Sequence, residues 1–327
     1  MQVTIINATI HTGNRWLVSP TVGFIELGHT VNWLGIQRGG FNLLYEGWTE
    51  EEPTPIEGLN MISHYTEEEA IKCITDSEIV IFNINHGDYS PIGIHGWAKL
   101  LNKYRPYNFF IFLGLDCQSG DYAQEELYEF KYQHYLRREA YTWYKDIAPY
   151  VGMSTHKEWN HTKDKTIDVS CLFGGANWNS ISGSVRPAII NAVRSCIPNS
   201  VIGTTQDAYT FDKYLDVIGA SKISVTAPGN GEFCYRDFEI LSNHTIMASR
   251  RTPIIHFNNF KDMESIILYT TPEELISKCN EVLDDEELYN SILKAQINVV
   301  NNYHTPKARA KQLIEYKAME RKDNYYE

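Results

Sequence analysis

The strongest constraint on the fold is the alternation of short apolar runs with amphipathic stretches along almost the whole chain. Four runs in the first third are nearly continuously apolar: "QVTIIN" (2–7), "HTVNWLGI" (29–36), "EIVIFNIN" (78–85) and "NFFIFLGL" (108–115). Such runs are typical of parallel strands that are covered on both faces. Because parallel strands require crossover connections, helices are expected between them. The pattern therefore predicts an α/β fold with doubly wound, Rossmann-like sheets.

Helical stretches occur where this fold requires them. Residues 66–75 begin with a capping box, in which Thr66 is followed by Glu69 three positions later. Pro91 suits the first turn of a helix over 91–104. A long amphipathic helix rich in Tyr, Glu, Lys and Arg is expected around 121–146.

The composition changes at residues 154–166, "STHKEWNHTKDKT", which are polar and charged. We interpret this segment as a linker, because the strand–helix alternation starts again after it. The prediction is an N-terminal domain (1–153), the linker (154–166), a C-terminal domain (167–303) and a terminal helix (304–327) that packs back toward the N-terminal domain. Further strands are expected at 167–175, 199–204, 222–227, 245–249, 253–257 and 265–270, and helices at 185–196, 211–220, 272–285, 286–303 and 305–320.

Composition narrows the class of protein. The 327 residues carry a formal net charge of −12 and are 43% hydrophobic, which predicts an acidic globular protein and disfavours indiscriminate nucleic-acid binding. No run approaches the roughly 18 apolar residues of a membrane span, and no basic n-region precedes an apolar core at the N-terminus. The six cysteines form no CxxC pair. We therefore expect reduced thiols and a location in the cytoplasm, with no membrane partner.

The segment "PGNGEFCYRDFE" (228–239) carries the clearest candidate site. Arg236 and Glu239 lie three residues apart, so a helix places both on one face. A guanidinium suits two phosphate oxygens, and a carboxylate suits the hydroxyls of a ribose. Gly231 lets the backbone of the preceding turn approach a ligand. The alternative is an ordinary Arg–Glu surface pair.

A second candidate is the turn after the strand at 167–175. Gly174 and Gly175 precede a helix, so their N–H groups and the helix N-terminus suit an anion. The turn has neither the GK[ST] of a Walker loop nor the spacing of a GxGxxG fingerprint. An ordinary strand–helix loop remains the alternative.

Four motifs follow one another in the C-terminal half: "DVSCLFGG" (168–175), "RDFEILSN" (236–243), "LYTTPEELISKCNEVLDDEE" (268–287) and "HTPKARA" (304–310). In this order they resemble the donor domain of GT-B glycosyltransferases, especially those of the spore-maturation type, over about residues 140–320. Asn243 stands where the family has a glycine, a change that Asn tolerates because it accepts left-handed conformations. The N-terminal half resembles the T-even phage DNA β-glucosyltransferases over residues 77–116.

The resemblance implies a GT-B fold, with residues 1–153 as the acceptor-side domain and 167–303 as the nucleotide-sugar domain, in a bacterial or phage-infected cell. It also implies roles for particular residues. Arg236 would hold the diphosphate of the donor and Glu239 its ribose, while Gly174, Gly175 and Arg186 would contact phosphates. A uridine diphosphate (UDP) sugar is the co-substrate that we expect.

Asp116, at the end of a buried strand, would be the catalytic base, although it could instead cap the next turn. His86, Asp88 and His11 are rival bases, because they follow strands in glycine-containing loops.

The expected mechanism is inverting and needs no obligatory metal. Retaining GT-B enzymes usually have seven residues between two glutamates in this helix region, whereas six separate Glu232 from Glu239. No DxD motif ends a strand, so positive side chains would neutralise the leaving diphosphate.

The acceptor is less constrained. Arg137 and Arg138 lie among aromatic residues in 130–145, a mixture that suits a nucleic-acid strand, although an amphipathic helix with solvated charges explains it equally. We expect sugar transfer to a hydroxyl, with a hydroxymethylated base in double-stranded phage DNA as the first candidate. The alternatives are a protein or polysaccharide acceptor, or a catalytically silent module that only binds nucleotide sugars.

Overall fold

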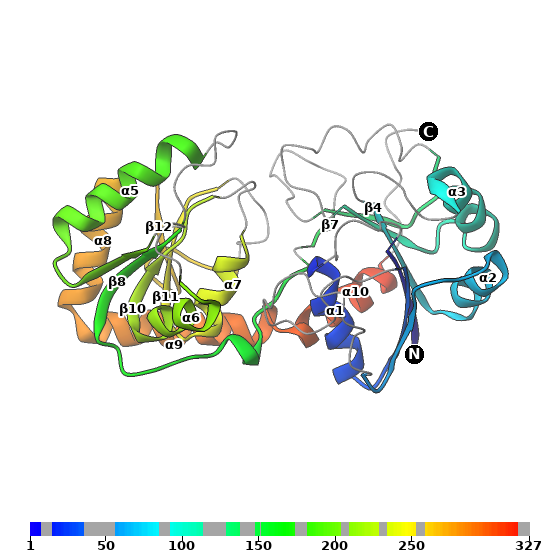
Figure 1. Ribbon diagram of the computed structural model, residues 1–327, viewed down its shortest axis with the longest axis horizontal. Coiled ribbons are helices and arrows are strands. Elements are labelled where there is room, and N and C mark those ends of the chain that lie inside the picture. Colours follow the sequence, from blue (N-terminus) through cyan, green and yellow to red (C-terminus); the bar gives the residue numbers. More distant parts are fainter. Residues whose placement is uncertain are drawn as a thin grey trace. The chain divides into compact units, whose positions relative to one another are not determined.

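The computed structural model describes residues 1–7, 15–35, 56–84, 92–113, 129–137, 148–150, 152–173, 182–203, 209–228, 234–252 and 259–319. The chain divides into two compact units, one made of Met1–Ser154 with Pro306–Glu327 and the other of Thr155–Thr305. Each unit is a parallel sheet with helices on its faces (Figure 1). Among the helices in these ranges, none has the length and apolar character needed to cross a membrane.

Unit 1 contains a sheet in the order β3-β2-β1-β4-β5-β6-β7, and every neighbouring pair is parallel. The chain runs outward in one direction from β1 and then returns to its other side at β4, so the topological switch point lies between β1 and β4. The strands are β1 (Gln2–Asn7), β2 (Thr30–Leu34), β3 (Leu59–Ile62), β4 (Ile79–Ile84), β5 (Phe110–Leu113), β6 (His134–Arg137) and β7 (Ala148–Pro149).

Helices cover both faces of this sheet, which explains why its central strands are apolar along their whole length. One face packs against α2 (Glu67–Asp76) and α3 (Gly93–Tyr104), whose buried members include Ile74 and Trp97. Helix α2 begins with the predicted capping box between Thr66 and Glu69. The other pair, α1 (Arg15–Glu26) and α10 (Pro306–Ala318), lie side by side (Figure 1).

Two close approaches hold α1 in place, one of them against α10. A Cβ built on Gly23 of α1 would lie 1.9 Å from the carbonyl oxygen of Pro306, so only a glycine lets the start of α10 pack here. Pro20 lacks the N–H that would bond the carbonyl of Trp16, and Gly152, with φ of 77°, lies against that carbonyl. Helix α1 was not predicted from the sequence, because a proline and a glycine interrupt its apolar periodicity.

The long helix expected around 121–146 is wrong for its described part. Residues His134–Arg137 form β6, which pairs with β5 on one side and β7 on the other. Tyr135 and Leu136 are buried, and the hydrogen bonds of two neighbouring strands outweigh the helical pattern of the side chains. Strand β3 is absent from the sequence-based assignment.

Unit 2 contains a second all-parallel sheet in the order β12-β11-β10-β8-β9. Its switch point lies between β8 and β10, because β9 and β10 add to opposite sides of β8. The elements agree with the predicted segments to within a few residues, except that the strand predicted at 253–257 lies outside the described residues. They are β8 (Ile167–Leu172), α5 (Ser182–Cys196), β9 (Ser200–Gly203), α6 (Phe211–Ala220), β10 (Ser221–Val225), α7 (Tyr235–Ser242), β11 (Ile246–Arg250), β12 (Ile267–Tyr269), α8 (Pro272–Asp284) and α9 (Glu286–Tyr303).

The segment 154–166 is anchored to unit 2 and includes a short 3-10 helix, Lys157–Trp159. The amide of Asn243 holds it: Nδ2 donates to the carbonyl of Trp159 at 2.7 Å, and Oδ1 accepts from the N–H of His161 at 2.7 Å. Asn243 has a φ of −96°, so the left-handed conformation expected of it is wrong. His244 has that conformation instead, with φ of 46°. Asn243 therefore contributes these hydrogen bonds, which a glycine at this position could not form.

Replacing Gly23 by alanine tests the packing of α1 against α10. In an unobstructed helix interior this change stabilises by about 0.5–1 kcal/mol. Here the added methyl group meets the backbone of Pro306, so we expect a loss of roughly 1–3 kcal/mol, read from chemical denaturation. Gly96→Ala in α3 is the matched control, because its methyl group meets only the side chain of Ile92. Stabilisation by Gly23→Ala would show that the close approach is wrong.

Candidate functional site

The candidate site lies at the switch point of the unit 2 sheet, at the carboxyl ends of the neighbouring strands β8 and β10. Arg236, in the first turn of α7, donates from Nε to the carbonyl of Leu172 at 2.9 Å and from Nη1 to the carbonyl of Ala227 at 3.4 Å. Leu172 ends β8, and Ala227 follows β10. One guanidinium therefore connects the two strand ends at the position where open α/β sheets bind ligands.

A second guanidinium lies beside the first. Arg186 of α5 donates from Nε and Nη2 to the carbonyl of Pro228, at 3.0 and 2.6 Å. The guanidinium carbons of Arg186 and Arg236 lie 5.6 and 5.3 Å from the centroid of the Phe173 ring. One buried aromatic ring thus holds two cations at the end of β8.

The electrostatics of Arg186 and Arg236 favour the binding of an anion. Burial lowers the pKa of Arg186, and the charge of Arg236 lowers it further. Burial acts in the same direction on the pKa of Arg236, but the ionisable groups of Tyr214 and Cys234, followed by those of Asp237 and Glu239, raise it on balance. Two neighbouring cations that repel each other are both stabilised when a phosphate binds next to them.

The first turn of α7 is held by the buried carboxylate of Asp237. Its Oδ1 accepts from the hydroxyl of Thr226, and its Oδ2 accepts from the N–H of Cys234 at 3.0 Å. Tyr269 donates its hydroxyl to the carbonyl of Thr226 at 2.8 Å. These bonds fix the direction of α7 and hence the position of Arg236.

Glu239 lies one turn further along α7 and is only 5% exposed. Its Oε2 accepts the hydroxyl of Tyr214, from α6, at 2.6 Å. Burial raises the pKa of Tyr214 well above its usual value, and the charge of Glu239 raises it further. Tyr214 is therefore a neutral donor at physiological pH. The structure thus combines two guanidiniums with an oriented carboxylate, a set that can bind a diphosphate and a diol.

Several predicted site residues lie outside the described residues: Gly174, Gly175 and Gly231 on the donor side, Asp116, His86, His11 and Asp88 as candidate bases, Arg138 as an acceptor contact, and Glu232. Their roles stay predictions. Arg186, Arg236 and Glu239 lie within the described residues of unit 2, and both arginines contact the Phe173 ring.

In unit 1, Arg137 ends β6 and is only 2% exposed. It lies in the sheet and not on the solvated helix that we expected. At the switch point of this sheet, Nδ2 of Asn83 donates to Oδ1 of Asn7 at 3.1 Å, and both side chains are buried. The two strand ends that precede His86 and His11 in the sequence therefore carry paired amides.

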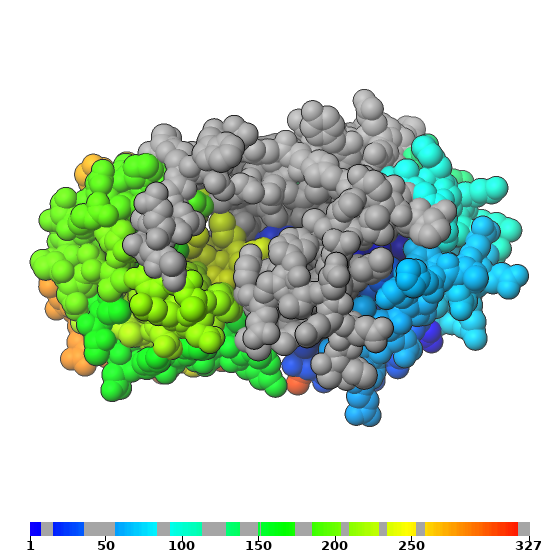
Figure 2. All heavy atoms as spheres, viewed as in Figure 1, coloured from blue at the N-terminus to red at the C-terminus, as the bar shows by residue number. Residues whose placement is uncertain are grey.

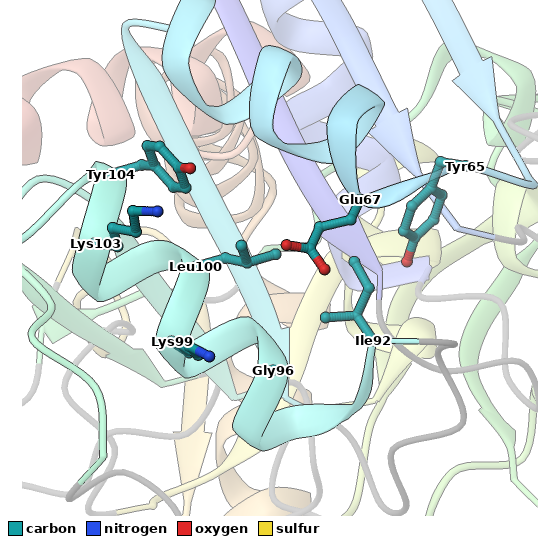
Figure 3. A pocket seen from close by; sticks show the side chains of 8 residues that line it. All are labelled: Tyr65, Glu67, Ile92, Gly96, Lys99, Leu100, Lys103 and Tyr104. Carbon is teal, nitrogen blue, oxygen red and sulfur yellow. The ribbon is translucent and has the colours of Figure 1, made fainter.

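Unit 1 also has a groove of about 510 Å³ between α2 and α3 (Figure 3). Glu67 extends from the start of α2 toward α3, which contributes Lys99 and Lys103. The blue and cyan atoms of these helices form part of the surface in Figure 2. The mixed charges do not define an anion site, and none of the predicted site residues lines the groove.

Sequence reasoning missed Phe173, Tyr214, Thr226 and Asp237. Phe173 directly precedes the glycine pair, and Asp237 stands at the third position of α7, which is a capping position. No sequence signal connects Tyr214 with Glu239. No cluster of three or more His, Cys, Asp or Glu side chains suited to a metal occurs in the part of the chain that the structure describes.

Part of the chain matches a known protein family. Residues 185–315 match the family model described as glycosyl transferase-like. No curated protein matches the sequence.

Solved structures resemble nearly the whole chain. A glycosyltransferase from Rickettsia africae ESF-5 is 13% identical with a TM-score of 0.59, covering 97% of this chain and 98% of that one. An alpha-glucosyltransferase in complex with UDP and a 13-mer DNA containing an HMU base is 12% identical with a TM-score of 0.62, covering 98% and 100%. HepE from Anabaena in complex with UDP is 9% identical with a TM-score of 0.60, covering 97% and 100%.

At these identities the likeness shows the fold, which is that of GT-B glycosyltransferases, and the fold prediction is confirmed. The family match adds that residues 185–315 form a glycosyltransferase-like domain, and this domain contains Arg186, Arg236 and Glu239. Together they confirm the GT-B fold of the chain and a glycosyltransferase-like domain at residues 185–315.

Replacing Asp237 by alanine tests what holds the site. We expect a loss of roughly 1–3 kcal/mol in the free energy of unfolding, because the buried Thr226 hydroxyl and Cys234 N–H lose their acceptor. Asp212→Ala is the matched control: Asp212 lies exposed in the first turn of α6 and contributes only a few tenths of a kcal/mol. Equal melting temperatures for the two variants would contradict the assigned role of Asp237.

Proposed function

We propose that this protein transfers a sugar from a UDP-sugar to a hydroxyl group. Arg236 and Arg186 bind the diphosphate, and Glu239 binds the ribose. The observation that carries the proposal is the arrangement in unit 2: two guanidiniums on Phe173 at the switch point, and a buried carboxylate one turn along α7. The UDP in the complexes of HepE and of the alpha-glucosyltransferase supports uridine as the nucleoside of the donor.

The chemistry assigns a different task to each group. Cleavage of the sugar–phosphate bond leaves negative charge on the diphosphate, and positioned guanidiniums stabilise that charge as it develops. Because Arg236 is already held by the carbonyls of Leu172 and Ala227, little reorganisation is required when the donor binds. No metal is needed in this proposal.

The attacking hydroxyl requires a base, for which Asp116 is the first candidate and His86, His11 and Asp88 are the others. We retain inversion at the anomeric carbon as a prediction. The anomeric configuration of the product, read by proton nuclear magnetic resonance, decides between inversion and retention.

For the acceptor we propose a hydroxymethylated base in double-stranded DNA. Support comes from the resemblance of the N-terminal half and from the alpha-glucosyltransferase structure that contains an HMU base. The formal net charge of −12 opposes DNA binding unless a local surface is basic. A protein or polysaccharide acceptor is the second candidate, favoured by the resemblance of the donor half to spore-maturation-type glycosyltransferases.

Binding of UDP tests the donor site. A ligand at 100 times its Kd stabilises by about 2.7 kcal/mol, which corresponds to a melting shift of roughly 5–10 °C for a unit of this size. We expect Arg236→Ala to lose most of this shift, and Arg186→Lys to lose part of it, since lysine cannot donate two parallel bonds. Arg194→Ala, at the other end of α5, is the control and should retain the shift. A full shift in both site variants would refute the diphosphate assignment.

Transfer to DNA tests the acceptor. We expect UDP-glucose to glucosylate a 13-mer duplex containing one 5-hydroxymethyl pyrimidine, detected as the mass of one added hexose, but not the unmodified duplex. Binding of the duplex should weaken as salt rises, because phosphate contacts release counterions. An unchanged mass at low salt, with UDP binding intact, would exclude this duplex and favour a protein or glycan acceptor.

A further inference from the structure

The hydrogen bond between Tyr214 and Glu239 bears on the nucleotide specificity of the site. Tyr214 belongs to α6 and Glu239 to α7, so two helices are required to form the pair. The 2.6 Å separation between the phenol oxygen and Oε2 is typical of a hydroxyl that donates to a charged carboxylate. Glu239 is 5% exposed, so the bond also compensates part of the cost of burying its charge.

The bond limits the orientations of the carboxylate. A glutamate side chain has three rotatable bonds, and a donor fixed on Oε2 selects one orientation of the terminal group. Tyr214 is itself held, because its ring stacks on Phe211 with centroids 5.9 Å apart and an interplanar angle of 19°. The main chain of Glu239 is also tied, since its carbonyl accepts from Nδ2 of Asn243 at 2.7 Å.

A fixed carboxylate can discriminate between sugars. A carboxylate has about four lone-pair positions, so it can accept a phenol and further hydroxyls at the same time. An aligned acceptor rejects an analogue that lacks the hydroxyl much more strongly than an acceptor that can rotate to another partner. The 2′-hydroxyl is the group that distinguishes a ribonucleotide from a 2′-deoxyribonucleotide.

We propose that Tyr214 is a specificity-determining residue that fixes Glu239 for the 2′-hydroxyl, so that the donor is a ribonucleoside diphosphate sugar and not a deoxythymidine diphosphate sugar. The inference rests on the proposed function, since it requires a nucleotide beside Arg236. Tyr214 acts through Glu239 and is a positioning residue, not a catalytic one.

The test compares UDP with 2′-deoxy-UDP by isothermal titration calorimetry on the full chain. We expect the wild type to prefer UDP by about 10- to 100-fold, the range for one hydrogen bond to a charged group. In Tyr214→Phe, binding of UDP should weaken about tenfold while binding of 2′-deoxy-UDP changes little. The preference should therefore fall toward unity.

Two further variants complete the design. Tyr289→Phe is the control, because the Tyr289 hydroxyl lies in α9 and is buried with no hydrogen-bond partner among the described residues. Glu239→Gln keeps the side-chain shape and should lose the same preference, which covers the case in which Tyr214→Phe does not fold. Circular dichroism melting confirms that each variant is folded.

The outcomes separate the two proposals. If the wild type binds neither nucleotide, the proposed function fails, and this inference fails with it. If it binds both equally, or if Tyr214→Phe weakens both by the same factor, the donor site stands and the role of Tyr214 is refuted. A collapse of the preference in Tyr214→Phe and Glu239→Gln, with Tyr289→Phe unchanged, supports the inference.

Discussion

The candidate site depends on the guanidinium of Arg236, which donates to the carbonyl groups of Leu172, at the end of β8, and of Ala227, after β10. At a switch point the connections leave neighbouring strands in opposite directions, so the carbonyls beyond the paired residues need donors other than a neighbouring strand. Arg236 supplies donors to both and so becomes part of the structure. Its charge is thereby held at the one position of the sheet where ligands of such folds bind.

Two buried carboxylates lie on the same helix as this cation. Asp237 and Glu239 are both nearly inaccessible, and burial of a carboxylate is costly unless donors surround it. Thr226 and Cys234 supply such donors to Asp237, and Tyr214 supplies one to Glu239. Apolar residues of similar volume could fill this space as well. In the proposed function, these groups orient a bound ligand.

The fold could be predicted largely because α/β proteins repeat one pattern. Apolar runs identified the central strands, and the capping box at Thr66 and Glu69 located α2 to within one residue. Failures occurred where two patterns compete. Residues 134–137 mix Tyr, Leu and Arg in a way that suits a helix or a strand, and the edge of β5 decided in favour of the strand. Pro20 and Gly23 concealed α1, since both residues are normally unfavourable in a helix and only the contact with α10 explains Gly23.

The sequence by itself determined that Arg236 and Glu239 share one face of a helix, because a spacing of three residues fixes this in any α-helix. The tertiary structure decided everything that surrounds them. Leu172 precedes Arg236 by 64 positions, and Tyr214 precedes Glu239 by 25, so both contacts arise only from the order of strands in the sheet and the packing of α6 against α7. Local spacing specifies one helix face, whereas contacts between distant segments depend on the whole core, which no short motif encodes.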